Sequence, residues 1–210
     1  MAKYIVITII AYLIGSVNFS VITTKKMAGF DVREKGSGNA GTTNMLRSVG
    51  KMAALITLIL DILKGVVAIG IAIITGVIFK NSDKALLVQL AALLVVVGHT
   101  FPIFFGFKGG KGVATSLGAL LMVNWQIGLI CLVFAVILMA LTRMVSLGSV
   151  GAAVLFPVLT LFIKTNYTVS SGSGYLVFSI LLAVLVLFNH RSNIKRILNG
   201  TENKLSFKKK

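Results

Sequence analysis

Three polar segments interrupt an otherwise apolar chain, and their residue types suit the binding of anions. The first covers residues 36–47 and combines glycines with hydroxyl groups, amides and one guanidinium, that of Arg47. Glycines let backbone N–H groups turn toward an anion, and arginine can bind phosphate oxygens through two parallel hydrogen bonds. No Gly-Lys-Ser/Thr sequence ends the segment, so it is not a Walker A loop. A plain flexible loop needs a few glycines but neither the amides nor the threonines, so we interpret the segment as an anion-binding loop.

The second segment covers residues 106–112, where two lysines bracket a pair of glycines. Gly112 precedes an apolar stretch, so the segment is expected to lead into a helix N-terminus with lysines and bare backbone amides around it. Such a terminus favours a phosphate group. A tight turn with lysines on the cytoplasmic side would explain the charges alone, but four glycines in seven residues favour anion binding. His99, just upstream, is equally consistent with helix capping, packing or catalysis.

The third segment covers residues 190–196. His190 and Asn193 are three residues apart, so on a continuing helix they share one face. Histidine titrates near neutral pH and can position or deprotonate a hydroxyl group. The alternative is a basic helix beside the membrane that contacts anionic lipid headgroups. We accept that alternative for the lysines at 208–210, and favour a functional role for His190 and Asn193.

Other polar residues support simpler interpretations. Asp61 and Lys64 lie three residues apart inside an apolar stretch, where charges tend to pair, and a structural ion pair explains them as well as an active-site role does. Ser146 is placed to cap a following helix. The few histidine, cysteine and acidic residues form no metal-ligand pattern, and no Ser-His-Asp arrangement has a motif context. We therefore expect no metal and no cofactor.

Composition defines the elements that must position these segments. Of the 210 residues, 57% are apolar and 12% charged, and the formal net charge is +16. A soluble domain of this size cannot bury so many apolar residues, which argues against a nucleic-acid-binding protein despite the charge. Disordered chains are poor in such residues, and a single cysteine, Cys131, excludes an internal disulfide framework.

Apolar stretches of about 20 residues indicate membrane crossings. The predicted fold is all-α: a polytopic integral membrane protein with seven transmembrane helices and a single membrane-embedded catalytic domain over residues 1–210. Asn124, Trp125 and Gln126 divide one long apolar block and are expected to form an interfacial turn. The expected spans are approximately residues 4–22, 52–79, 85–104, 113–123, 126–142, 147–163 and 175–188.

Basic residues predict the orientation. Most of them fall in the connection 25–51, at Lys108 and Lys111, at Arg143, and in the tail from Arg191 onward. Since basic residues are depleted from outer loops, an odd number of spans with the N-terminus outside and the C-terminus in the cytoplasm fits best. Five spans with re-entrant pieces give the same orientation. All three polar segments then face the cytoplasm.

These residues predict a site with room for at least one phosphorylated substrate and an apolar wall that suits a fatty chain. A transporter or flippase for a phosphorylated metabolite or lipid is the alternative. Transporters often show internal repeats and paired broken helices, and the sequence shows neither. Polar motifs on one face favour an enzyme that takes a soluble substrate from that side.

Taken together, segments 36–47, 106–112 and 190–204 closely resemble the three motifs of the bacterial acyl-phosphate-dependent glycerol-3-phosphate acyltransferases, in order and spacing. The resemblance covers nearly the whole chain, including the Asp61 and Lys64 region and residues 145–149. One position departs from the pattern, Ala40, where proline is expected to be common. Members of this family transfer a fatty acyl group from acyl phosphate to the sn-1 hydroxyl of glycerol 3-phosphate, giving lysophosphatidic acid and phosphate, in the first committed step of phospholipid synthesis.

The resemblance implies roles for residues in all three motifs. Ser37, His190 and Asn193 are the implied catalytic residues. The implied contacts of glycerol 3-phosphate are Ser37, Thr43, Arg47, Lys108, Ser146, His190 and Asn193. The implied seat of the acyl phosphate comprises Gly38, Asn39, Gly41, Thr42, Gly109, Gly110, Lys111 and Gly112. We expect direct transfer with His190 or a substrate phosphate as proton acceptor, and a multi-pass protein of the bacterial cytoplasmic membrane whose partners are its two substrates and membrane lipid, with no nucleic acid.

Overall fold

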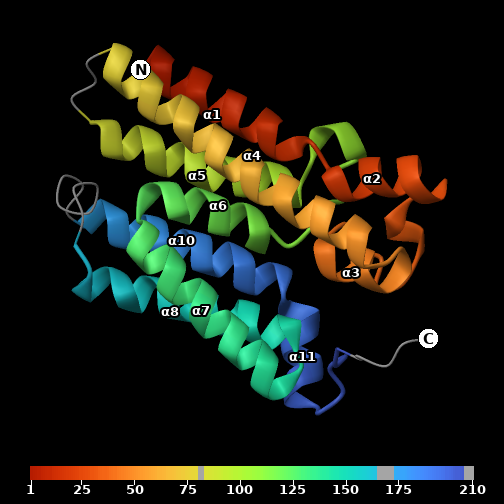
Figure 1. The fold of residues 1–210 in the computed structure, drawn as a ribbon. Coiled ribbons are helices and arrows are strands. Elements are labelled where there is room, and N and C mark those ends of the chain that lie inside the picture. The colour runs from red at the N-terminus through yellow and green to blue at the C-terminus, as the bar shows by residue number, and fades with distance from the viewer. Residues whose placement is uncertain (80–82, 165–172, 206–210) are drawn as a thin grey trace. The chain divides into compact units, whose positions relative to one another are not determined.

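The computed structural model describes residues 1–79, 83–164 and 173–205, and every regular element in these ranges is a helix (Figure 1). The all-α prediction is therefore confirmed for the described part of the chain. The lysines at 208–210 lie outside it. In chain order the elements are α1 (Ala2–Ser16), α2 (Phe19–Ala28), η1 (Val32–Glu34), α3 (Thr42–Ser48), α4 (Lys51–Ile78), α5 (Lys84–Thr100), η2 (Ile103–Phe105), α6 (Val113–Val123), α7 (Trp125–Thr142), α8 (Val145–Phe162), α10 (Ser173–Asn189) and α11 (Arg191–Leu198).

Within the described ranges, five helical segments are long and apolar enough to cross a membrane, or six when the bent pair α10 and α11 counts as one span. The segment that the sequence predicts as a span at 113–123 is α6, which has only 11 residues. At 1.5 Å per residue it extends about 16 Å, roughly half the thickness of a bilayer core. The predicted break is confirmed at Asn124, whereas Trp125 and Gln126 already belong to α7: α6 ends at Val123 and α7 begins at Trp125, with Asn124 Oδ1 accepting a hydrogen bond from Ile127 N at 3.1 Å.

The chain forms two compact units, Met1–Val123 and Asn124–Lys210. In the first unit, α1 packs along α5 and α4 (Figure 1). Gly15 and Gly98 lie at the crossing of α1 and α5, where a Cβ on either one would overlap a backbone carbonyl oxygen of the other helix. Small residues of this kind allow apolar helices to approach closely in a membrane, where close packing replaces the hydrophobic effect as the driving force.

The first apolar stretch is broken between α1 and α2, and Lys64 fills the break. Its Nζ donates to the carbonyl oxygens of Gly15 (3.1 Å) and Val17 (2.9 Å), which the break leaves without helical partners. The same Nζ lies 2.9 Å from Asp61 Oδ1. Asn18 caps α2 by accepting a hydrogen bond from Val21 N at 3.2 Å. The intramembrane charge pair thus supports the bend that leads into the first polar segment.

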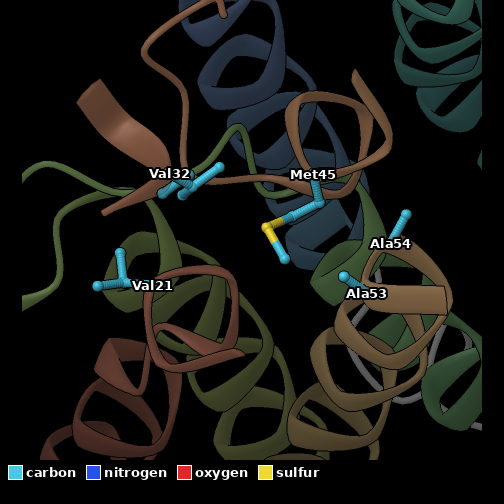
Figure 2. Close-up of a cluster of buried hydrophobic side chains, with 6 residues drawn as sticks. Val21, Val32, Met45, Ala53 and Ala54 are labelled. Carbon is cyan, nitrogen blue, oxygen red and sulfur yellow. The ribbon is translucent and has the colours of Figure 1, made fainter. Parts of the chain in front are cut away.

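A cluster of buried apolar side chains anchors the first polar segment. Figure 2 shows Val21 from α2, Val32 from η1, Met45 from α3, and Ala53 and Ala54 from α4 around one common centre. All five side chains are buried. The short α3 has too few residues to be stable alone, so this packing is what holds it, and with it the polar segment, on the end of α4.

In the second unit, α8 packs against both α7 and α10. Phe156, Tyr175 and Phe178 form an aromatic cluster with ring centroids 5.6 to 6.4 Å apart. The chain bends by 66° between α10 and α11. His190 lies at this bend, so the two residues do not share the face of one continuing helix: His190 is the N-cap residue of α11, and Asn193 lies in its first turn.

Candidate active site

Asn44 organises the first glycine-rich segment. Its Oδ1 accepts a hydrogen bond from Ser37 N (2.9 Å), and its Nδ2 donates to the carbonyl oxygens of Val32 (2.9 Å) and Lys35 (3.0 Å). Gly36 has a φ of 60°, and a Cβ there would overlap Asn44 Oδ1. The buried amide therefore holds the loop in one conformation and leaves the Ser37 side chain exposed.

The remaining residues of this segment lead into α3. Gly41 is the N-cap of α3, and Thr42 and Thr43 are half-buried in its first turn. Arg47 lies in the last turn of α3 with its side chain exposed, and the exposed Gly38 and half-buried Asn39 precede Gly41. Hydroxyl, amide and guanidinium donors are therefore carried on one short, well-anchored stretch, as anion binding requires.

Arg33 ties the first segment to the second. Its Nη1 donates to the carbonyl oxygens of Phe105 (2.7 Å) and Lys108 (3.1 Å), while its Nη2 donates to Asp31 Oδ2 (2.8 Å). The hydrogen bonds from Arg33 hold the pKa of Asp31 below its usual range, although burial acts in the opposite direction. The pair therefore stays ionised at neutral pH and fixes the backbone around Lys108.

These contacts surround an open hollow of about 560 Å³ in the first unit. Its lining residues are Asp31, Arg33, Glu34, Gly38, Phe105, Gly106 and Lys108. Two predicted site residues, Gly38 and the exposed Lys108, thus share one hollow although 70 positions separate them in sequence. Most N–H donors of the Arg33 guanidinium are hydrogen-bonded to protein groups, so Lys108 is the lining cation better placed to bind an anion.

The glycines of the second segment do not present bare amides throughout. Gly109 N donates to Thr100 O and Gly110 N donates to His99 O, each at 3.1 Å. The expectation of bare amides at these two positions is therefore wrong: both N–H groups fold the turn back onto the end of α5. Lys111 and Gly112 follow, half-buried and buried, at the start of α6.

The His190 side chain is held by the end of α10, in the second unit. Its Nδ1 lies 2.8 Å from the carbonyl oxygen of Val186, and the imidazole is buried. A carbonyl only accepts hydrogen bonds, so Nδ1 carries the proton, and in the neutral ring the lone pair is then on Nε2. This tautomer suits a base or a hydrogen-bond acceptor acting through Nε2.

Glu202 lies beside the two other predicted site residues of this unit, Asn193 and Ser146. Asn193 Nδ2 donates to its Oε1 at 3.0 Å, and Arg196 Nε donates to its Oε2 at 2.9 Å. Burial opposes ionisation of Glu202, but hydrogen bonds from Asn193 and Arg196 and the positive charge of Arg196 outweigh it and hold its pKa below the usual range. The carboxylate therefore fixes the amide of Asn193, and it lies beside Ser146.

Sequence reasoning missed four of these organising residues: Asp31, Arg33, Asn44 and Glu202. Asn44 was noticed only as one amide among several, and Glu202 lies in the third motif without a recognisable pattern of its own. The Asp-x-Arg spacing of 31 and 33 was the one local signal, because such a pair can form a fork of hydrogen bonds. Among the described residues, no group of three or more histidine, cysteine or acidic side chains could hold a metal ion.

Apolar spanning helices and glycine-rich segments with cationic side chains define a class: helical integral membrane proteins built to bind phosphorylated compounds. Comparison with known proteins specifies the family. The model of the family "Glycerol-3-phosphate acyltransferase" matches residues 5–200. The glycerol-3-phosphate acyltransferase of Clostridioides difficile (strain 630) is 44% identical over 207 residues, covering 99% of this chain and 98% of that relative. The enzyme of the same name from Thermoanaerobacter sp. (strain X514) is 45% identical over 206 residues, covering 98% of each chain.

Solved structures agree with this result. The chain is similar to the crystal structure of PlsY (YgiH), an integral membrane glycerol 3-phosphate acyltransferase, in its glycerol 3-phosphate form. The TM-score is 0.81 and the identity 35%, over 97% of this chain and 96% of that one. The lysophosphatidic acid form of the same protein gives a TM-score of 0.79 and 34% identity, over 97% and 95%. The chain belongs to the glycerol-3-phosphate acyltransferase family, and it is an integral membrane acyltransferase. The transporter alternative is thereby set aside.

Proposed function

We propose that this protein transfers a fatty acyl group from acyl phosphate to the sn-1 hydroxyl of glycerol 3-phosphate, with lysophosphatidic acid and phosphate as products. One observation carries the proposal: two glycine-rich segments with cationic side chains meet in the first unit. Arg33 donates to the carbonyl of Lys108 from the stretch 32–35, whose carbonyls accept hydrogen bonds from Asn44 of the first segment. A Cβ on Gly110 would lie 2.8 Å from the carbonyl oxygen of Ala40. A donor and an acceptor that each carry a phosphate need two anion sites with cations between them.

The proposed roles follow the resemblance residue by residue. The exposed cations Arg47 and Lys108 bind phosphate oxygens and reduce the repulsion between the two substrates. Ser37, Thr43 and Ser146, together with His190 and Asn193, contact glycerol 3-phosphate. The proposed seat of the acyl phosphate is formed by Gly38, Asn39, Gly41, Thr42, Gly109, Gly110, Lys111 and Gly112. In this seat Gly109 and Gly110 act by the shape of the turn, because their N–H groups are bonded to α5.

The proposed reaction is direct transfer within a ternary complex. The sn-1 oxygen attacks the acyl carbonyl carbon, the bond from that carbon to the phosphate oxygen breaks, and phosphate leaves with the bond electrons. The hydroxyl proton passes to His190 Nε2 or to a phosphate oxygen. Phosphate is already a good leaving group, so no acyl intermediate on Ser37 is needed. Positioning and electrostatic stabilisation supply the catalysis.

The same proposal includes the arrangement in the membrane. We place the protein in the bacterial cytoplasmic membrane as a single catalytic domain, with its polar segments and C-terminus on the cytoplasmic side. The seven-span count additionally requires that the 11-residue α6 crosses the membrane. Basic residues concentrated in residues 25–51, at 108 and 111, and in α11 support this orientation.

A donor comparison tests the proposal. Purified protein is incubated with labelled glycerol 3-phosphate and palmitoyl phosphate, palmitoyl-coenzyme A or palmitoyl acyl carrier protein. We expect product only with palmitoyl phosphate, acylated at the sn-1 position. With a labelled acyl group, no label should remain on the protein after denaturation. Turnover with another donor alone refutes the acyl phosphate assignment, and label retained on Ser37 refutes direct transfer.

Removing either exposed cation should weaken substrate binding. We expect Arg47→Ala and Lys108→Ala each to raise KM for at least one phosphorylated substrate roughly 10- to 150-fold, because a charge-assisted hydrogen bond contributes about 1.5–3 kcal/mol. Steady-state kinetics with each substrate varied in turn measures this. Lys26→Ala, an exposed lysine in the last turn of α2, is the matched control and should behave as wild type. Unchanged KM values in both variants would refute the anion-site assignment.

A further inference from the structure

A buried polar cluster in the first unit has no role in the proposed transfer. It consists of Asp61 and Lys64 on α4 and His99 on α5, with side chains 2%, 3% and 5% exposed. Asp61 Oδ1 lies 2.9 Å from Lys64 Nζ and 3.5 Å from His99 Nδ1. Charged groups at such depth are costly even when paired, and they commonly mark functional positions.

The fold alone accounts for two of the three residues. Lys64 donates to the carbonyl oxygens of Gly15 and Val17 at the break between α1 and α2, and Asp61 balances its charge. That arrangement is complete as an ion pair without a third group. His99 adds a titratable ring to the same carboxylate, so its presence requires another explanation.

The Nε2 edge of the His99 ring supplies that explanation. A Cβ on Gly110 would overlap His99 Nε2 and would lie 2.8 Å from the carbonyl oxygen of Ala40. The backbone of His99 also accepts the hydrogen bond from Gly110 N, and its neighbour Thr100 accepts that from Gly109 N. His99 therefore contacts the second glycine-rich segment through both its ring and its backbone, at the point where the carbonyl of Ala40 brings in the first.

We propose that His99 is a positioning residue that sets the shape of the phosphate-binding turn at 109–112. Asp61, itself paired with Lys64, lies at the Nδ1 edge of the ring, and the Nε2 edge supports Gly110 close to the carbonyl of Ala40. The inference rests on the proposed function, because it takes this turn as part of a substrate seat. Displacing preorganised binding groups by about 1 Å can cost on the order of 100-fold in activity. The contact of His99 with the turn at 109–112 is therefore expected to affect the kinetics.

Kinetics with each substrate varied separately tests the inference. We expect His99→Ala to raise KM for the substrate whose phosphate the turn holds, acyl phosphate on the proposal above, roughly 10- to 100-fold, with KM for the other substrate and kcat little changed. His99→Asn keeps a donor toward Asp61 but not the ring beneath Gly110, and should show the same selective defect. Gln89→Leu, a buried polar position on the same helix, is the control and should leave the ratio of the two KM values unchanged.

Gly110→Ala gives a second measurement that does not require removal of the histidine. The added Cβ presses on the ring and should produce the same selective rise in KM. In a double-mutant cycle, His99→Ala and Gly110→Ala together should cost less than the product of their separate effects, because both disturb one contact. Wild-type KM values, equal rises for both substrates, or independent effects of the two substitutions would overturn the inference, including where His99→Ala alone fails to fold.

The result also separates this inference from the proposed function. A selective rise in KM for glycerol 3-phosphate supports positioning by His99 but shows that the turn holds the acceptor, so the seat proposed for acyl phosphate is wrong. Where wild type uses another acyl donor, the proposed donor fails, and KM for that donor replaces KM for acyl phosphate in the comparison.

Discussion

Replacing His190 with alanine is expected to lower kcat by about 10²- to 10⁴-fold, the usual contribution of a positioned general base. The hydrogen bond between Nδ1 and Val186 O fixes the ring, so in the proposed reaction Nε2 is the atom that acts on the acceptor hydroxyl. The substitution also removes a buried side chain, so membrane insertion and thermal stability are measured in parallel. Ser192→Ala, an exposed residue in the first turn of α11, serves as the matched control.

Two further variants distinguish a base from a hydrogen-bonding group at this position. His190→Asn can retain a donor toward Val186 O but has nothing at the Nε2 position, whereas His190→Gln can place an amide there but cannot accept a proton. Loss of activity in both identifies His190 as the proton acceptor. Activity in the Gln variant alone assigns it an orienting hydrogen bond and leaves the proton to a substrate phosphate. Wild-type kcat in the alanine variant contradicts any role.

The helices of this protein could be predicted because their signal is local. Apolar stretches of bilayer length have one stable form in lipid, the helix, since only it satisfies its own backbone hydrogen bonds. The break at Asn124 was also predictable, because an asparagine that caps the next helix is a local signal. The bend of 66° at His190 was not, because no proline or glycine marks residues 189–191.

The organisation of the site was less predictable, because it depends on contacts between distant residues. Arg33 binds the carbonyls of Phe105 and Lys108, more than 70 positions away, and a carbonyl leaves no trace in residue type. The amides of Gly109 and Gly110 present the same difficulty: their glycines suggested open donors, yet both bond to the end of α5. Residue types indicated which hydrogen-bond donors were present, but not which of them would be bonded to other groups of the protein.

Replacing Glu202, the one acidic residue in the sequence of residues 124–210, is expected to damage the second unit. Its side chain is 3% exposed and accepts hydrogen bonds from Asn193 and Arg196. Glu202→Ala leaves both donors without their acceptor, at a cost of about 1.5–3 kcal/mol for the charged hydrogen bond alone, and frees the amide of Asn193 to turn. We therefore expect lower thermal stability together with a loss of acyl transfer.

The pH dependence of stability gives an independent check on the same carboxylate. The pKa of Glu202 lies below its ordinary value of 4.5 in the folded protein, so the ionised form favours folding. Its contribution is complete above about pH 4.5 and is lost as the pH falls through the lower folded value. The stability difference between wild type and Glu202→Gln should therefore shrink on acidification below that point.

Because Gln can still accept from Asn193 but opposes Arg196 with its own amide, this variant should also retain more activity than Glu202→Ala. A difference in stability that is constant with pH, or equal activity in the two variants, would show that the carboxylate neither stabilises the folded state by its charge nor orients Asn193.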